Sequence, residues 1–320
     1  MSRNRIDVHT HYMGGTVARL MENVTFPGGF RIAPWTVDGA LRFMDDHEIA
    51  AQVLSFPSAL AGEPRPGLAA GLAVGLARNI NEELAEIVRA RPDRFGAFAS
   101  LPLDAPDDAL KEITYALDEL GLDGVTLPSN AKGEYFGEPF FEPVLAELAR
   151  RRTPVFVHPE NCPHIDVLGM GRVGSIVEFP LDTTRNIVNA VYRGVFKRHP
   201  GLTLILAHGG GALPALGWRI AAHSGLGRAP QDAAIDAGHI ADVLRGLYYE
   251  TALAGSRNSL LPTLEVTDVD HVLFGTDWPA APVPVIDDNT GNLTKFDGFT
   301  PEELTAVERG NATRLFPRFA

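Results

Sequence analysis

The stretch IDVHTH, residues 6–11, decides the expected fold when it is set beside HVLFGTD, residues 271–277. Both are short apolar runs typical of a buried strand, and both end in side chains that can bind a metal ion. In an open sheet the first and last strands usually lie too far apart to share a site, whereas in a closed barrel they are neighbours. A common site for His9, His11 and Asp277 therefore favours a closed barrel.

Six further runs of this kind lie between the two stretches, at residues 51–55, 94–100, 124–127, 154–158, 202–208 and 247–251. Patterns with apolar residues three and four positions apart separate them, as at residues 108–121 and 183–199. Strands that alternate with helices along 320 residues predict one α/β domain, residues 1–320, with the (β/α)8 TIM-barrel fold. An open, doubly wound sheet is the structural alternative.

Three segments show no clear periodicity. Residues 13–35 follow the first strand, contain FPGGFRIAP and are long for a connection between a strand and a helix. We expect this segment to form an inserted lid over the mouth of the barrel. Residues 159–180 and 278–301 follow the fifth and eighth strands and are also expected to be irregular.

The two histidines of the first strand are expected to share one face. Residues two apart in a strand point to the same side, so His9 and His11 project into the barrel while Thr10 faces the helices. Taken alone, such a pair is equally consistent with a hydrogen-bonded pair in a strand. His158 ends the run PVFVH and Asp277 ends HVLFGTD, so the four side chains together predict a mononuclear metal site.

His208, in LAHGGGALP, is a fifth such residue, and a mononuclear site does not need it as a ligand. A histidine titrates near neutral pH, so a place beside the metal suits it to proton transfer. A second metal is the alternative, but dinuclear barrels of this kind usually carry a bridging lysine at the end of the fourth strand, where Leu127 and Pro128 stand here. Residues 209–211 are glycines that either bind an anion or allow close packing, and packing is favoured.

Several motifs are spread over nearly the whole chain: HTH at 9–11, FR at 30–31, VHP at 157–159, HGGG at 208–211 followed by Arg219, and GTDWP at 275–279. As a set they resemble a branch of the amidohydrolase superfamily, which contains aminocarboxymuconate semialdehyde decarboxylase and related aromatic-acid decarboxylases. Residues 126–159 and EFPLDTTR at 178–185 look most like the methylsalicylate decarboxylase type.

The resemblance implies metal ligands at His9, His11, His158 and Asp277, with His208 as the acid/base residue. Some aromatic-acid decarboxylases of this branch carry glutamate where His9 stands, and those often work with manganese. Histidine here favours Zn²⁺ as the cofactor and leaves Mn²⁺ possible.

The resemblance also implies that Arg31 and Arg219 bind the carboxylate of a small-molecule substrate, because guanidinium groups form bidentate hydrogen bonds with carboxylates. It places Arg219 near the site of the neighbouring subunit in a homodimer. A surface ion pair is the alternative for each arginine. Phe179 and Trp278 are candidate walls for an aromatic ring, with plain packing as their alternative.

The reaction implied is the non-oxidative decarboxylation of a small aromatic or muconate-type acid, with a salicylate-like acid favoured. Asp277 and His208 are the candidate proton carriers, and the resemblance favours Asp277 as the donor to the ring. Three alternatives remain: a metal-dependent hydrolase of a lactone or amide, a hydratase of an unsaturated dicarboxylate, and a metal-stabilised scaffold without activity.

Charge and composition narrow the partners. The formal net charge is −12 and no lysine or arginine cluster could follow a phosphate backbone, which argues against nucleic acid. No apolar run approaches the roughly 18 residues of a membrane span, and no signal-peptide pattern follows Met1, so we expect a cytoplasmic enzyme. The single cysteine, Cys162, cannot form an internal disulfide, which fits a reducing compartment.

Overall fold

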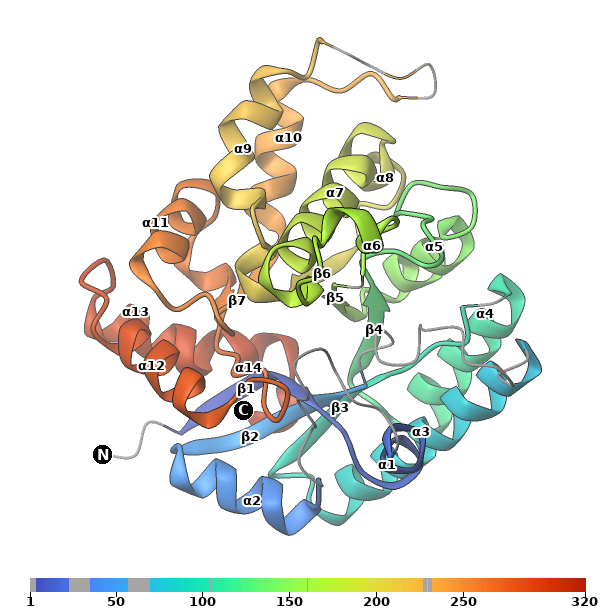
Figure 1. Cartoon of the computed structure of the whole chain (residues 1–320), viewed down its shortest axis with the longest axis vertical. Coiled ribbons are helices and arrows are strands. Elements are labelled where there is room, and N and C mark those ends of the chain that lie inside the picture. Colours follow the sequence, from blue (N-terminus) through green and yellow to red (C-terminus); the bar gives the residue numbers. More distant parts are fainter. Residues whose placement is uncertain are drawn as a thin grey trace.

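The computed structural model describes residues 4–22, 35–56, 70–103, 105–159, 161–226, 229 and 232–320. Eight parallel strands follow one another in the order of the sequence, and helices surround them (Figure 1). The strands are β1 (Arg5–His11), β2 (Ile49–Ser55), β3 (Phe95–Ala99), β4 (Gly124–Pro128), β5 (Pro154–His158), β6 (Thr203–Leu206), β7 (Tyr248–Glu250) and β8 (Val272–Leu273).

Helices connect consecutive strands, as parallel pairing requires. They are α1 (Gly15–Met21), α2 (Val37–Asp46), α3 (Ala70–Ala90), α4 (Pro106–Thr114), α5 (Glu142–Arg151), α6 (Ile165–Leu168), α7 (Glu178–Tyr192), α8 (Val195–Arg198), α9 (Leu213–Ala222), α10 (Ala237–Gly246), α11 (Arg257–Val266), α12 (Val283–Thr294), α13 (Pro301–Thr305) and α14 (Asn311–Leu315). Short 3-10 turns lie at Gly174–Ile176, His208–Gly210, Val269–His271 and Pro317–Phe319, and π-helical turns at Tyr115–Glu119 and Ala306–Gly310. Within the described ranges, no helix is both long and apolar enough to cross a lipid bilayer.

Backbone hydrogen bonds join β1 to the residues that follow β8. The N–H of Val8 donates to the carbonyl of Phe274 at 3.0 Å, and the N–H of Asp277 donates to the carbonyl of His9 at 2.8 Å. The first and last strands of an open sheet do not pair in this way. The predicted barrel is therefore confirmed, and the open, doubly wound alternative is wrong.

A bulge in β1 shapes the interior of the barrel. The register of β1 against β2 shifts between Asp7 and Thr10. Without this shift, strict alternation would leave Val8 and His9 on opposite faces. Instead Val8 belongs to the interior apolar cluster, and the ring of His9 lies 4.9 Å from the interior ring of Phe156. The bulge thus places His9 next to the apolar side chains that fill the barrel.

The apolar residues divide into an outer and an inner set. The outer set packs between the strands and the surrounding helices. The inner set fills the barrel below the histidines and includes Phe98, Phe156 and Leu273. Phe316 and Phe319 join this set, and the ring of Phe316 packs 5.6 Å from that of Phe98. The residues around α14 therefore close the amino end of the barrel and leave the carboxyl end as its polar mouth.

The segment expected to be a lid begins with a helix. Residues 15–21 form α1, and the carboxylate of Glu83 in α3 accepts a hydrogen bond from the N–H of Thr16 at 3.0 Å. This contact supplies the cap that Gly14 lacks, so a distant residue stabilises a helix that the local sequence does not predict. Residues 23–34, with Arg31, lie outside the described residues, and the lid stays a prediction.

The expectation of an irregular segment at residues 278–301 is wrong for about half of its length. Residues 283–294 form α12, which begins after Pro282 and has Pro284 in its first turn. Proline is compatible with that position because the first turn of a helix needs no N–H donor. Within the described part of residues 159–180, only the four-residue helix α6 and one 3-10 turn precede α7, in keeping with the expectation.

Candidate metal centre

Four side chains converge at the mouth of the barrel. His9 and His11 come from β1, His158 ends β5, and Asp277 follows β8, and one ligand atom from each lies within 4.8 Å of the others. The Nε2 atom of His11 lies 2.8 Å from Oδ1 of Asp277 and 3.1 Å from Nε2 of His9. All four residues are buried. The structure therefore brings together the four residues that the sequence predicts as ligands.

The backbone of Asp277 adopts a conformation that is rare outside glycine. Its φ angle is 65°, in the left-handed region. The N–H of Asp277 is tied to the carbonyl of His9, so the strand pairing that closes the barrel also fixes this carboxylate. Such local strain is common at functional sites, where the surrounding structure holds it in place.

Burial and neighbouring charges set the ionisation of these groups. Burial lowers the pKa of His11, and it lowers the pKa of His158 well below the usual range. Burial raises the pKa of Asp277, but the adjacent histidines outweigh it and hold that pKa well below its usual range. Burial lowers the pKa of His9, yet the carboxylates of Glu250 and Asp277 outweigh it and raise the pKa to about 10. The site thus offers two neutral imidazoles and an ionised carboxylate, and it attracts positive charge.

Contacts at the Nδ1 atoms of His9 and His11 fix the orientation of the two rings. Nδ1 of His9 lies 2.8 Å from Oε1 of Glu250, so this nitrogen carries the proton and donates it. Ser55 donates its hydroxyl to the carbonyl of Thr10 at 3.0 Å, and its oxygen lies 3.3 Å from Nδ1 of His11. With both Nδ1 atoms engaged, the Nε2 atoms of His9 and His11 face the centre of the cluster, where a bound cation would displace the proton that His9 otherwise holds on Nε2.

These residues fit a bound metal ion. Three imidazoles and one carboxylate form a donor set that zinc accepts, and the oriented Nε2 atoms present their lone pairs to a common point. Nδ1 of His158 is buried and has no hydrogen-bond partner among the described residues. A buried ring nitrogen in this position is explained by a ligand that the protein chain itself does not supply.

His208 stands beside this cluster. Its Nε2 atom lies 3.6 Å from Oδ2 of Asp277 and has no hydrogen-bond partner within the described ranges. Its φ angle of 56° is left-handed, and its N–H donates to Oε1 of Glu250. A ring nitrogen that faces the second oxygen of Asp277 suits proton transfer.

The glycines after His208 serve packing. A side chain on Gly210 would approach the ring of Tyr249 to 2.9 Å, and one on Gly211 would overlap the carbonyl oxygen of Pro180. Both glycines also have positive φ angles. The favoured interpretation of these glycines therefore agrees with the structure.

The two predicted aromatic walls lie in different surroundings. The ring of Phe179, in α7, packs 6.3 Å from that of His158, so it borders the cluster. The ring of Trp278 stacks on Phe43 of α2 with centroids 4.7 Å apart. Trp278 is thus engaged in packing against a helix, and its contact with substrate stays a prediction.

Of the two predicted arginines, only Arg219 lies within the described residues, and no contact with another described residue joins its side chain to the cluster. Arg219 is exposed on α9, and its guanidinium makes no hydrogen bond or ion pair with another described residue. Arg31 lies outside the described residues. Cys162 is buried, lies outside the metal-binding group and donates its S–H to Glu178 at 3.2 Å.

Sequence reasoning missed two residues of the site, Glu250 and Ser55. Both are at the carboxyl end of predicted strands, LYYET at 247–251 and AQVLS at 51–55. Polar residues at strand ends were the signal that found the ligands, and the same signal applied to every strand would have included these two. Their partners are far away in the chain, 241 residues for Glu250 and His9.

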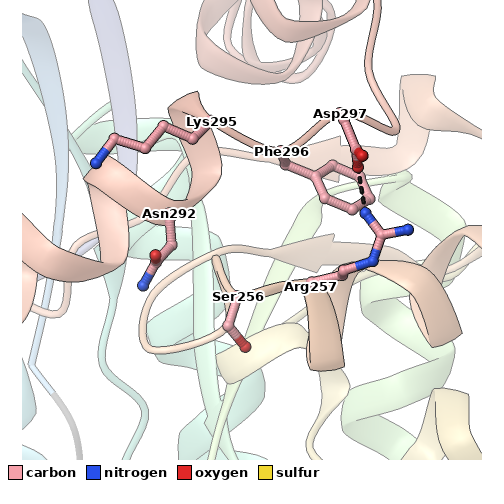
Figure 2. Close-up of a pocket in the computed structure, with 6 residues that line it drawn as sticks. All are labelled: Ser256, Arg257, Asn292, Lys295, Phe296 and Asp297. Atoms are coloured by element: carbon pink, nitrogen blue, oxygen red, sulfur yellow. Dashed lines mark hydrogen bonds and ion pairs between the residues drawn. The ribbon is translucent and has the colours of Figure 1, made fainter.

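A shallow pocket of about 310 Å³ lies apart from these residues, between the start of α11 and the end of α12. Figure 2 shows its lining residues: Ser256, Arg257, Asn292, Lys295, Phe296 and Asp297. Arg257 pairs with Asp297, and its guanidinium lies 5.9 Å from the ring centre of Phe296. The pocket contains none of the predicted site residues.

Known proteins resemble this chain over almost its whole length. Residues 6–318 match the model of a family described as Amidohydrolase. A decarboxylase from Aspergillus niger is 33% identical, with 99% of this chain and 88% of that protein covered. A 6-methylsalicylic acid decarboxylase from Penicillium expansum is 32% identical, with 98% and 96% covered. The crystal structure of a 2,6-dihydroxybenzoate decarboxylase complexed with 2,6-dihydroxybenzoate has a TM-score of 0.80 and 25% identity, with 98% of this chain and 99% of that chain covered.

Proposed function

This chain belongs to the amidohydrolase family, and from that premise we propose that it is a metal-dependent, non-oxidative decarboxylase of a small aromatic acid. A salicylate-like substrate is favoured over a muconate-type one, because the full-length relatives include a 6-methylsalicylic acid decarboxylase. The observation that carries the proposal is the cluster of His9, His11, His158 and Asp277, with Nε2 of His208 at 3.6 Å from its carboxylate.

We assign the metal to His9, His11, His158 and Asp277. A donor set with three nitrogens favours zinc, whereas manganese prefers more oxygen ligands. When bound, the ion supplies a positive charge that polarises an oxygen of the substrate.

The reaction requires a proton at the ring carbon that carries the carboxylate. Once that carbon is protonated, its bond to the carboxylate breaks, the electron pair returns to the ring and carbon dioxide leaves. Oδ1 of Asp277 faces His11 at 2.8 Å, while Oδ2 faces His208 at 3.6 Å. This division lets Asp277 hold a proton on Oδ2 while Oδ1 stays among the ligands.

We assign Asp277 as the donor to the ring and His208 as the residue that orients substrate oxygens beside it. The neighbouring histidines keep the pKa of Asp277 well below its usual range, so the carboxylate must take up its proton as the substrate binds. Of the histidines around Asp277, we assign the relay of that proton to His208, because it lies outside the proposed ligand set and its Nε2 atom has no hydrogen-bond partner among the described residues.

Binding of the substrate is assigned to Phe179, Arg31, Arg219 and Trp278. Phe179 borders His158 and offers an apolar edge to an aromatic ring. The arginines supply bidentate hydrogen bonds to the carboxylate, with Arg219 reaching the site of a neighbouring subunit. The cytoplasmic location stays a prediction.

A proposed homodimer is supported by large apolar side chains that lie exposed on α9 and in the segment between α6 and α7. Met170 is 76% exposed in the segment before α7, and Trp218, beside Arg219 on α9, is 81% exposed. Large exposed apolar side chains are candidates for burial in an interface between subunits. Such an interface would place Arg219 at the boundary between subunits.

Release of carbon dioxide from hydroxybenzoic acids tests the function. We expect the purified enzyme with zinc to release carbon dioxide from salicylate or 6-methylsalicylate and to lose this activity with a chelator. Activity with 3-hydroxybenzoate should be absent, because its hydroxyl cannot donate electrons to the carbon that bears the carboxylate. A chain that releases nothing from hydroxybenzoic or muconate-type acids, but opens a lactone or amide, is a hydrolase instead.

His208→Ala tests the role of the fifth histidine. We expect turnover to fall by about 100-fold or more, within the range that a positioned acid or base contributes, with metal content unchanged. His223→Ala, at an exposed histidine after α9, is the matched control and should keep full activity. Loss of the metal from His208→Ala would make His208 a ligand and contradict its assignment.

A further inference from the structure

We propose that Glu250 is a positioning residue that braces two parts of the site at once: the metal ligand His9 and the backbone of His208. The inference rests on the proposed function for the role of His208. Its effect on metal binding can be measured without any substrate.

Glu250 receives three hydrogen bonds from three different parts of the chain. Its Oε1 atom lies 2.8 Å from Nδ1 of His9 and 2.5 Å from the backbone nitrogen of His208, and its Oε2 atom lies 2.6 Å from the backbone nitrogen of Ala252. The side chain is completely buried. Since all three partners donate an N–H, the side chain between them must accept hydrogen bonds at both of its oxygen positions.

Only a carboxylate satisfies this arrangement. An ionised carboxylate has acceptor positions on both oxygens, whereas a carboxamide has one oxygen and one NH2 group. In either orientation, glutamine at position 250 would turn its NH2 group toward an N–H that also donates. An unpaired donor in a buried site costs about 1–3 kcal/mol.

The neighbouring strand leaves room for this carboxylate. Gly275 follows β8, next to β7, and a side chain there would overlap Oε2 of Glu250 and approach the Cβ atom of His9 to 2.9 Å. Glycine at position 275 is therefore required by space, although its backbone is not left-handed. The absence of a side chain at Gly275 thus leaves the space that the Glu250 carboxylate occupies.

Two consequences follow for the site. The contact with His9 keeps the proton on Nδ1, which leaves the Nε2 lone pair for the metal and makes the imidazole a stronger donor. The contact with the N–H of His208 holds that residue at its left-handed φ of 56°, and this backbone directs its ring toward Asp277. A change at Glu250 should therefore weaken metal binding and loosen His208 together.

Glu250→Gln in the full-length, metal-free protein tests the proposal, with zinc alone as the ligand. Competition with a chromophoric chelator should show a zinc affinity about 10–100-fold below wild type, as expected when a partner behind a metal ligand is lost. Hydrogen exchange of the amides of residues 207–212 should accelerate in the same variant, because the N–H of His208 loses its acceptor. Neither measurement depends on the substrate, so both can be read even if no acid is decarboxylated.

Glu112→Gln is the matched control. Glu112 is also a buried glutamate, 1% exposed, and it accepts hydrogen bonds from Arg78 at 2.9 Å and from Asn81 at 2.8 Å, away from the metal ligands. We expect this variant to lose stability but to keep the zinc affinity and the exchange rates of residues 207–212. Equal losses of zinc affinity in both variants would reduce the effect of Glu250 to general stability and overturn the proposal.

Glu250→Asp distinguishes the loss of a hydrogen-bond acceptor from a change in side-chain length. It is also the variant to measure against wild type if Glu250→Gln does not fold. Aspartate keeps an all-acceptor group but is shorter, so its zinc affinity should lie between those of wild type and Glu250→Gln. An affinity below that of the glutamine variant would overturn the role of the carboxylate. Zinc affinity within twofold of wild type in Glu250→Gln would overturn the contact with His9, and unchanged exchange at residues 207–212 would overturn the brace on His208.

Discussion

The hydroxyl of Ser55 shows how a neutral group directs a ligand at the scale of one residue. It donates to the carbonyl of Thr10 at 3.0 Å, so its oxygen is left to accept from Nδ1 of His11 at 3.3 Å. Ser55 is buried. Ser55 ends β2, and from this position its hydroxyl orients the ring of the proposed metal ligand His11.

We expect Ser55→Ala to weaken zinc binding by less than Glu250→Gln. In this variant the Nδ1–H group of His11 loses its acceptor, at a cost of about 1–3 kcal/mol. The lost contact is longer than the one between His9 and Glu250, and its acceptor carries no charge, so the effect should be smaller. The chelator competition used for Glu250 measures both variants under the same conditions. A larger loss in Ser55→Ala than in Glu250→Gln would show that the charge on Glu250 is unimportant.

The cluster of His9, His11, His158 and Asp277 could be predicted from the sequence because these residues lie at the ends of apolar strands, and the fold brings the ends of parallel strands together. Glu250 and Ser55 occupy equivalent positions, but nothing local marks them. Glutamate in LYYET is as consistent with a solvated strand end as with a buried partner of His9. The distance between Glu250 and His9 in the folded protein distinguishes these two interpretations, and a single sequence does not contain that distance.

At the scale of elements, a charged contact joins α5 to α8. The carboxylate of Glu142, in the first turn of α5, accepts hydrogen bonds from Arg198 at 2.8 Å and from His199 at 2.8 Å. These bonds outweigh partial burial and lower the pKa of Glu142 to about 2 from an ordinary value of 4.5. The native state therefore holds fewer protons than the unfolded chain between these pH values.

Glu142→Gln should destabilise the protein more at pH 7 than at pH 3. Because the native pKa is depressed, the contribution of Glu142 is complete above about pH 4.5 and is lost as the pH falls toward 2. The pair is partly exposed, so we expect a loss of about 0.5–1 kcal/mol at pH 7. Urea unfolding of both proteins at pH 7 and pH 3 checks this, and an equal difference at the two pH values would contradict it.

The strands could be predicted more reliably than the added helices. Every strand of the barrel overlaps an apolar run of the sequence, because burial on both faces demands one. α12 was missed because VPVIDDNTGNLT contains proline, glycine and asparagine and lacks a regular apolar face. α1 was missed because its cap comes from Glu83 in another helix.

At the scale of the whole molecule, the proposed homodimer makes two inactive variants complementary. Arg219→Ala removes the residue that each subunit is proposed to lend, and His208→Ala removes a residue that each subunit keeps. In a mixed dimer, the Arg219→Ala subunit retains its own His208 and receives Arg219 from its neighbour. One of the two sites is then complete.

Mixing the two variants after reversible dissociation should restore activity. Random pairing makes half of the dimers mixed, so we expect about a quarter of wild-type activity from equal amounts. Each variant alone should stay inactive, and sedimentation should show a dimer. Trp218→Asp should yield monomers, and a dimer that survives this change would place the interface elsewhere.

The backbone hydrogen bond from Asp277 to His9 has a consequence for how the protein is made. On the ribosome, Asp277 is added 266 residues after His11, whose ring it contacts in the folded protein. Until Asp277 has left the ribosome, the nascent chain carries an incomplete cluster. The proposed metal ion therefore finds its complete set of ligands only after β8 has been translated and has paired with β1.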